Sequence, residues 1–429
     1  MVDLATAARG NLSPVGAGFN LVNTIIGSGI LALPYALREA GFYLGLAVMV
    51  LVALLSYAAL NTLIHSGRRV GLYRFEDVSA AALGRPGHYL LSFALLVNSV
   101  GSCISYLIIV GDTATPIAQN LFGAGPLTSR QAVIALAAVG CTLPLLFFRT
   151  LEPLVRASVA STACLPFIVA IVAVRGPAYR TSPEPVPMPV FGPSVLPAFG
   201  IIAFAYSCTQ TAFQSYLTLR HRTMSGWRRA AAFANGLALA IYLAFAITSY
   251  RSFGMLTEPN VLNNFAHDDA LANLARMLLA FSLTLTYPMQ FYPIRDLLGE
   301  SLALAPGGRR VGIHALTLAL FASTLAAALA VSDLGFVFKL VGTAASSLLL
   351  FGLPGIVYLR LVSPYLSSKT AQAPAGEGTA LLDLAHPSGD DDIAEPHTSL
   401  VSVLLLAVGA AVFVIGTCTS IREAVSSSK

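Results

Sequence analysis

The sequence predicts an all-α polytopic membrane protein, and three observations support that class. Hydrophobic residues make up 56% of the chain and charged residues only 10%, whereas a soluble globular protein carries about 25% charged residues. Apolar runs of about 20 residues, each long enough to cross a bilayer as a helix, recur along nearly the whole length. These runs do not alternate between apolar and polar residues, which argues against a membrane β-barrel. The net charge of +5 is small, so we expect a lipid bilayer and no nucleic acid as partner.

We expect about eleven membrane-spanning helices, separated by loops rich in glycine, proline or arginine. Their expected ranges are 14–36, 43–66, 88–112, 130–148, 153–174, 194–219, 228–250, 271–292, 311–331, 335–359 and 398–418. Lys and Arg are concentrated in the N-terminal segment and in the loops after the even-numbered spans. Cytosolic loops carry such an excess, so we expect a cytosolic N-terminus and, with an odd number of spans, a non-cytosolic C-terminus.

The first span, "NLVNTIIGSGILALPYA", has helix-breaking and polar residues at its centre. Gly27, Ser28 and Gly29 interrupt the apolar run, and Asn23 lies one turn earlier. An unsatisfied backbone group in lipid costs several kcal/mol, so protein or a water-filled cavity must enclose this interruption. Close helix packing would explain the small residues alone. The polar neighbours and a second interrupted span favour a binding site instead.

The sixth span carries the second interruption, the polar run Tyr206, Ser207, Cys208, Thr209 and Gln210 inside an apolar helix. Interrupted helices at corresponding positions of two halves are typical of an inverted-repeat transporter. The N-termini of half-helices favour an anion such as a carboxylate, and their C-terminal carbonyl groups favour a cation or an amine. A zwitterionic amino acid fits both kinds of helix end, so we predict that both interruptions bind an amino acid substrate.

The eighth span contributes two mid-span threonines, Thr284 and Thr286, in "FSLTLTYPMQFYPIRD". Their hydroxyls could simply bond back to their own helix. Together with Asn23 and the free carbonyl of Ile26 in the first span, they could instead form an oxygen-lined site for a hard cation such as sodium. Tyr106, in the middle of the third span, is a candidate to line the substrate site, and a packed aromatic is the equally weighted alternative.

Three segments carry a resemblance to a known family: "FNLVNTIIGSGILALPYA" (19–36), "GSCISYLIIVGD" (101–112) and "TLTYPMQFYPIRD" (284–296). With the span pattern of nearly the whole chain, they resemble the amino acid/auxin permease family. Within that family, the sequence resembles the solute carrier 38 branch of neutral amino acid transporters. It is also similar to the fungal vacuolar amino acid transporters. The resemblance implies the LeuT-like fold of the APC superfamily, with ten helices in two inverted five-helix repeats plus an eleventh helix. It also implies secondary transport of amino acids, driven by sodium or protons.

Carried over by position, the resemblance places Asn23, Thr284 and Thr286 where the family binds sodium. It places residues 27–29 at the substrate-binding break. Two departures leave questions open. The sixth span has "CTQTAF" where many relatives have a His-containing run, which leaves the substrate and the coupling proton undecided. A long outer loop with paired cysteines is absent, which suggests an organellar or simpler member of the family.

The expected order of segments follows from the spans and the repeats. It is a cytosolic N-terminus (1–13), a first five-helix repeat (14–174), a Pro-rich outer loop (175–193), a second five-helix repeat (194–359), a disordered acidic cytosolic loop (360–397), the eleventh helix (398–418) and a non-cytosolic tail (419–429). The acidic loop is too polar to fold alone. Its segment "EGTALL", Glu377 to Leu382, has the form of an acidic dileucine signal for sorting adaptors, and a chance match is the alternative.

Two basic residues, Arg276 and Lys339, lie inside predicted spans. Ionisable groups there are usually functional, although both are close enough to span ends to extend toward the interface.

The predicted function is secondary active transport of amino acids, neutral ones by resemblance, through alternating access. We expect no enzyme activity, because no nucleophile with a base, paired acids or metal ligands lie together in the spans. A channel would need a filter-like pore loop, and none is present. An amino acid-sensing receptor with little net flux remains an alternative, because it could keep the same site. No cofactor is expected besides the coupling ion. The membrane is expected to be endolysosomal, vacuolar or plasma.

Overall fold

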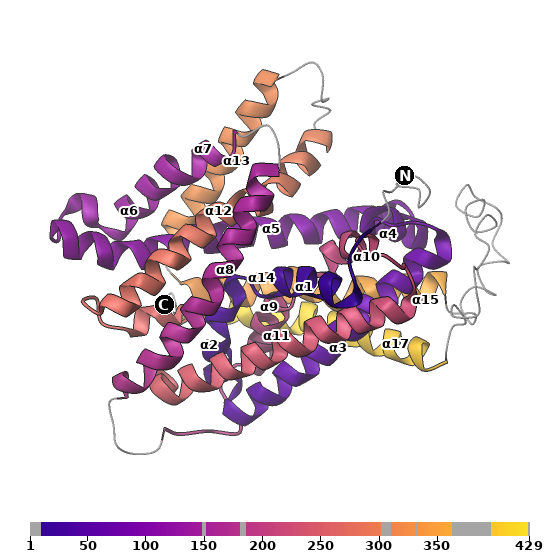
Figure 1. Ribbon diagram of the computed structural model, residues 1–429, viewed down its shortest axis with the longest axis horizontal. Helices are drawn as coiled ribbons and strands as arrows, with labels where there is room; N and C mark the ends of the chain where they lie inside the picture. Colours follow the sequence, from indigo (N-terminus) through magenta and orange to yellow (C-terminus); the bar gives the residue numbers. More distant parts are fainter. Residues whose placement is uncertain are drawn as a thin grey trace.

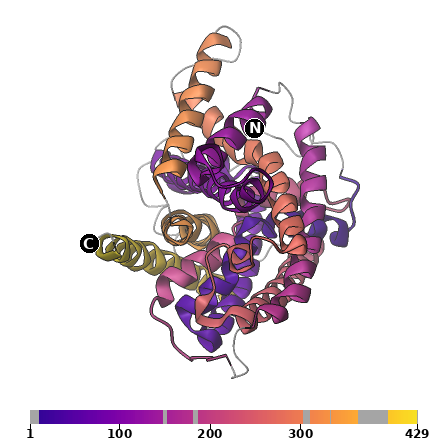
Figure 2. The same cartoon turned by 90° about the vertical axis from the view of Figure 1, so that its left-hand side faces the viewer.

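The computed structural model describes residues 10–147, 152–180, 186–301, 310–331, 333–362 and 396–427. Within these ranges the chain is helical, and its β-type pairing is limited to an isolated bridge between Leu12 and Leu219. Several of the long helices lie roughly along the longest axis of the molecule (Figure 1), and Figure 2 views the bundle along that axis. The predicted all-α class is confirmed.

Two spans are interrupted near their centres, at the residues that the sequence predicted. The first consists of α1 (Pro14–Ile25), a 3₁₀ turn (Ser28–Ala32) and α2 (Leu33–Ala40), with a bend of 55° at the break. The sixth consists of α9 (Val195–Ala205), a 3₁₀ turn (Thr209–Thr211) and α10 (Ala212–Leu217). Each span is therefore two short helices whose facing ends meet inside the bundle.

The other helices fill the remaining predicted positions, with two differences: α4 lies in the predicted loop after the second span, and α18 continues as helix to Ser427, past the predicted end of the eleventh span at 418. Their bounds are α3 (Phe42–Val70), α4 (Phe75–Leu83), α5 (Arg85–Phe122), α6 (Arg130–Ala137), α7 (Leu143–Leu145), α8 (Glu152–Arg175), α11 (Met224–Phe253), α12 (Ala270–Ser301), α13 (Arg310–Ala330), α14 (Leu334–Val341), α15 (Leu353–Leu361), α17 (Pro396–Ala411) and α18 (Thr417–Ser427). Wider π-helical turns join some of them, at Ala138–Thr142, Gly342–Ser346, Leu348–Gly352 and Val412–Gly416. Short 3₁₀ turns lie between spans, at Pro126–Thr128, Gly176–Tyr179, Gly254–Leu256 and Val261–Asn264.

The number of apolar helices agrees with the sequence pattern. Among the described residues, eight helices are long and apolar enough to cross a bilayer, or nine with the bent first pair. Two shorter apolar helices, Arg130–Leu145 and Ala163–Tyr179, take the positions of the predicted fourth and fifth spans. The third span is longer than predicted: α5 continues past Pro116 and ends only at Gly123, whose φ of +79° no helix adopts.

Part of the predicted organisation lies outside the described residues. Residues 363–395, which include Glu377 to Leu382, are among those that the structure does not describe. The disordered acidic loop and its sorting signal therefore stay predictions.

Main-chain hydrogen bonds join the two interrupted helices where α2 ends and α9 begins. The amide of Ser194 donates to the carbonyl of Glu39, and that of Gly192 donates to the carbonyl of Ala40, both at 2.8 Å. These bonds involve backbone alone and hold the two helix ends as one piece.

A second pair of main-chain bonds joins the same two helices at their other ends. The amide of Leu12 donates to the carbonyl of Thr218 at 3.0 Å, and the amide of Arg220 donates back to Leu12 at 2.9 Å. Leu12 lies just before α1 and Thr218 just after α10, so the start of the first span and the end of the sixth are fixed to each other.

The eleventh helix packs closely along the tenth span through glycines. A Cβ placed on Gly355 of α15 would lie 2.7 Å from the carbonyl oxygen of Ser402 in α17. A Cβ placed on Gly409 would lie 2.6 Å from the amide nitrogen of Gly352. Neither contact leaves room for a side chain, so the last two spans approach at backbone distance.

A buried carboxylate ties α8 to the start of α12. Oδ2 of Asp269 lies 2.6 Å from Nη2 of Arg175 and accepts a hydrogen bond from the Tyr179 hydroxyl at 2.7 Å. Its other oxygen accepts from the amides of Leu271 and Ala272 and caps α12. Burial acts to raise the pKa of Asp269, but the hydrogen bonds from Arg175 and Tyr179 outweigh it and lower the pKa to about 2.

We predict that Asp269→Asn lowers the free energy of unfolding by about 1–2 kcal/mol, because a charge-assisted hydrogen bond is lost. The lowered pKa means that this stabilisation is complete above pH 4 and is lost only as the pH falls toward 2. Thermal unfolding of the purified chain should therefore show the same deficit at pH 7.5 and at pH 5. Asp268→Asn, an exposed neighbour, is the matched control. A deficit that disappears at pH 5 would contradict the prediction.

Candidate functional site

The two interruptions lie against each other at the centre of the bundle. Gly27 adopts an extended conformation (φ −116°, ψ −155°) that ends α1 and starts the next turn. A Cβ on Gly29 would lie 2.7 Å from the Cα of Ala205, the last residue of α9, so the two backbones touch there. A Cβ on Gly27 would meet nothing within 4 Å, so this residue borders open space. A side chain is thus excluded at Gly29 by the other break, whereas at Gly27 the surrounding protein leaves room for one.

A tyrosine of α11 joins both breaks. The hydroxyl of Tyr242 lies 2.6 Å from the carbonyl oxygen of Ile25 and 2.9 Å from that of Ala205, and the side chain is fully buried. These two carbonyls are the last of α1 and α9, where the helix dipoles place negative partial charge. Sequence analysis missed Tyr242, because a single hydroxyl in an apolar span has no distinguishing pattern.

The second break holds several buried polar atoms that have no hydrogen-bond partner among the described residues. They are the Tyr206 hydroxyl, Oγ of Ser207 and Oε1 of Gln210. Their neighbour Thr209 is different, because its hydroxyl donates to the carbonyl of Leu349 at 2.9 Å. The side chain of Cys208 is fully buried, near the Ser56 hydroxyl of α3. Buried polar groups in native proteins are nearly always satisfied, so the three unpartnered atoms are available to a ligand.

The first break has polar neighbours on the third and eighth spans. The buried side chain of Tyr106 lies close to those of Ser28, Thr286 and Gln290. The structure therefore brings three of the predicted residues together from α5, α12 and the first break. Gln290 was not predicted, although an amide in the middle of "TYPMQFYP" was a visible signal. As with Tyr242, only the packing of the helices shows that Gln290 lies near the first break.

The four predicted cation ligands differ from one another in their hydrogen bonds and in their exposure. The hydroxyls of Thr284 and Thr286 donate to Ala280 and Ser282 of their own helix at 2.8 and 2.9 Å, as the sequence alternative allowed, and keep lone pairs free as acceptors. Asn23 is exposed, whereas Ile26 is buried.

The helices that carry these four residues do not pack mainly against each other. α1 packs mainly against α11, whereas α12 packs mainly against α5 and α8. Gathering of the four residues around one cation therefore remains a prediction.

Interrupted helices that meet at an uncharged polar centre, within a bundle of apolar helices, define this protein as a membrane transporter of the LeuT-like fold. Two solved structures share that fold. The inward-facing conformation of Mhp1 aligns with 99% of this chain and 93% of that chain, at a TM-score of 0.62. The substrate-bound outward-open state of a Na⁺-coupled sialic acid symporter aligns with 96% and 90%, at a TM-score of 0.54. Both are 12% identical to this chain, so they show the fold.

The family is established by sequence. Residues 10–375 match the family model described as "Transmembrane amino acid transporter protein", and the chain belongs to this family. The mouse "Putative sodium-coupled neutral amino acid transporter 11" is 31% identical over 359 residues, which cover 82% of this chain and 79% of the relative. "Vacuolar amino acid transporter 2" of Saccharomyces cerevisiae is 25% identical over 371 residues, covering 82% and 77%. The protein is thus an integral membrane transporter and not an enzyme, as predicted.

We predict that Tyr242→Phe lowers the maximal rate of amino acid uptake about tenfold or more, because two buried helix-end carbonyls lose their shared donor at about 1–3 kcal/mol. The matched control is Tyr250→Phe on the same helix, whose hydroxyl donates to Pro187 outside the breaks at 3.2 Å. Uptake by both variants in proteoliposomes, with thermal stability measured in parallel, separates the effects. Equal uptake by the two variants would show that Tyr242 does not position the breaks.

Proposed function

We propose that this protein carries neutral amino acids across its membrane by alternating access, with the flux coupled to sodium or protons. The supporting observation is the pair of facing breaks, with unpartnered polar atoms of Tyr206, Ser207 and Gln210 on one side and open space at Gly27 on the other. The names of the mouse and yeast relatives fit the proposal, since they describe amino acid transporters.

The substrate class follows from the charges at the breaks. Residues 23–30 and 205–212 contain no Asp, Glu, Lys, Arg or His. A buried net charge without a partner is strongly unfavourable, so a substrate of zero net charge fits best. The ends of α1 and α9 present carbonyls to the ammonium group, and the N–H groups that begin the next turns favour the carboxylate. A zwitterion with an uncharged side chain satisfies both ends without any ionised residue.

Alternating access requires a body that moves as one unit. The main-chain bonds at Leu12 and at Glu39, together with Tyr242 in the middle, join the first and sixth spans along their length. We propose that these two spans rock together against the remaining helices. A cation held near Asn23, Thr284 and Thr286 drives transport only if it binds the two orientations with different affinity.

Membrane and orientation belong to the same proposal. The distribution of Lys and Arg supports a cytosolic N-terminus. An endolysosomal, vacuolar or plasma membrane is proposed as the location, and the yeast relative's name supports the vacuolar choice.

Uptake of a radiolabelled amino acid mixture into proteoliposomes tests the function. We expect accumulation under either a sodium gradient or a proton gradient, and loss of the coupled accumulation in Asn23→Ala. The gradient that drives uptake identifies the coupling ion. Absence of flux under both gradients, with amino acid still bound by the purified chain, would favour a receptor instead.

A second variant tests the break itself. Gly27→Val should abolish uptake without preventing membrane insertion, because its side chain would fill the open space beside the break. Gly236→Val on α11 is the control, since a Cβ there also meets nothing within 4 Å but lies on an exposed helix face. Uptake retained by Gly27→Val would show that the space is not used by the substrate.

A further inference from the structure

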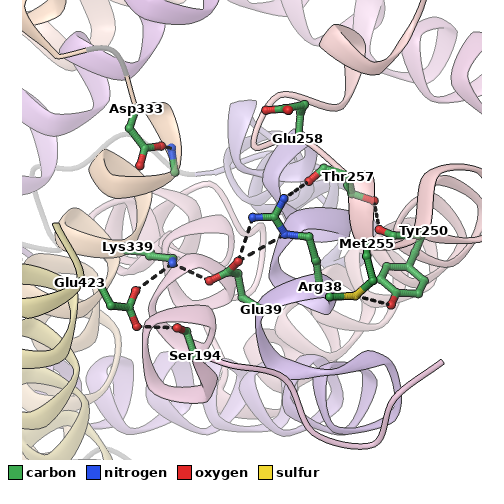
Figure 3. Close-up of polar contacts among 12 residues, drawn as sticks. Arg38, Glu39, Ser194, Tyr250, Met255, Thr257, Glu258, Asp333, Lys339 and Glu423 are labelled. Carbon is green, nitrogen blue, oxygen red and sulfur yellow. Dashed lines mark hydrogen bonds and ion pairs between the residues drawn. The ribbon is translucent and has the colours of Figure 1, made fainter. Parts of the chain in front are cut away.

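Four charged side chains form a cluster at the end of the bundle that we propose faces away from the cytosol (Figure 3). We call Arg38, Glu39, Lys339 and Glu423 the outer quartet. Nζ of Lys339 lies 2.5 Å from Oε2 of Glu39 and 3.0 Å from Oε2 of Glu423. Nη2 of Arg38 lies 3.1 Å from Oε1 of Glu39. The side chains of Lys339 and Glu39 are only 10% and 7% exposed, so these charges depend on each other for compensation.

The outer quartet connects elements that are distant in sequence. Arg38 and Glu39 lie at the end of α2, Lys339 in α14 and Glu423 in α18. The hydroxyl of Ser194, just before α9, donates to Oε1 of Glu423 at 2.5 Å. Figure 3 shows Lys339 between the two carboxylates, with Arg38 on the far side of Glu39. The cluster thus spans the boundary between the interrupted helices and the last two spans.

Tyr35 adds to the contact across this boundary. Its ring centroid lies 4.5 Å from Cζ of Arg38 on its own helix and 5.5 Å from Nζ of Lys339. Both cations are therefore placed for cation–π contact with one ring. The guanidinium of Arg38 also donates to the carbonyl of Thr257, in the segment between α11 and α12, at 2.9 Å.

The quartet can divide along that boundary without leaving a charge alone. Arg38 and Glu39 are neighbours on one helix and stay paired wherever that helix goes. Lys339 and Glu423 lie on spans that pack at backbone distance through Gly355 and Gly409. Separation of α2 from α14 therefore produces two neutral pairs, whereas loss of a single partner would leave a buried charge uncompensated, which strongly disfavours the separated state.

We propose that Glu423 is a positioning residue that retains Lys339 when α2 moves away with Glu39, so that the outer side opens as two neutral ion pairs. This inference rests on the proposed rocking of the first and sixth spans. It gives the eleventh helix, which lies outside the two five-helix repeats, a part in the transport cycle: it supplies the carboxylate that allows the gate to open.

The test measures outer access to the second break. Ser207→Cys is introduced into a full-length chain whose five native cysteines are replaced, and its labelling by a membrane-impermeant methanethiosulfonate is timed from the outer face of proteoliposomes of known sidedness. Glu423→Gln should slow labelling about tenfold, because Lys339 then depends on Glu39 alone. Glu39→Gln should accelerate labelling, because Lys339 keeps Glu423 and loses its tie to α2. These isosteric changes at one cluster should act in opposite directions.

Further variants separate positioning from folding. Glu423→Asp should restore labelling, and Glu39→Gln combined with Glu423→Gln should label faster than Glu423→Gln alone. Glu258→Gln, an exposed glutamate of the same face that Figure 3 also shows, should label like the parent.

Unchanged labelling in Glu423→Gln, or a double variant as slow as that single variant, would overturn the proposal. Amino acid uptake is recorded separately with the unmodified chain, so its absence there would count against transport and not against the gate.

Discussion

An interrupted helix stays in lipid only if protein groups replace the hydrogen bonds lost at the break, and this requirement organises the centre of the molecule. Tyr242 supplies one hydroxyl to the last carbonyls of both α1 and α9. The backbone of Gly29 touches that of Ala205, so the two breaks lie directly side by side. Satisfying one break thus means placing the other beside it. The helix ends at the breaks have backbone groups that their own helices leave unsatisfied. The partial charges of these groups allow a site without ionised residues to bind a zwitterion.

The sequence predicted the breaks well, because Gly27 and Gly29 around a serine have few explanations inside an apolar run other than packing or a site. Each predicted apolar run corresponds to an apolar helix of the structure, although the fourth and fifth of these helices are shorter than the others. The sequence did not predict the end of α5 at Phe122, where a glycine rather than hydropathy stops the helix. Tyr242 and Gln290 were also missed, since a single polar residue gains meaning only from the helices packed against it.

The charged residues inside the spans also show that a local sequence pattern does not reveal the partners of a side chain. Sequence analysis singled out Arg276 and Lys339 but could not separate a functional group from one that extends to the interface. The structure gives each a different setting. Arg276 is fully buried and donates to the carbonyls of Leu262, Phe265 and Ala266. Lys339 is held by carboxylates from Glu39 and Glu423, which lie 300 and 84 residues away in the chain, so no spacing in the sequence could have paired them.

The kinds of bond in the structure indicate where motion can occur. The first and sixth spans are joined at both ends by main-chain hydrogen bonds, at Leu12 and at Glu39. Each of these bonds joins two main-chain groups, so it does not depend on the identity or protonation of a side chain. At the outer end, Lys339 joins the first span to the tenth through a side chain, and a side chain with two carboxylate partners can release one and keep the other. We therefore propose that the division between the moving unit and its support passes through the outer quartet.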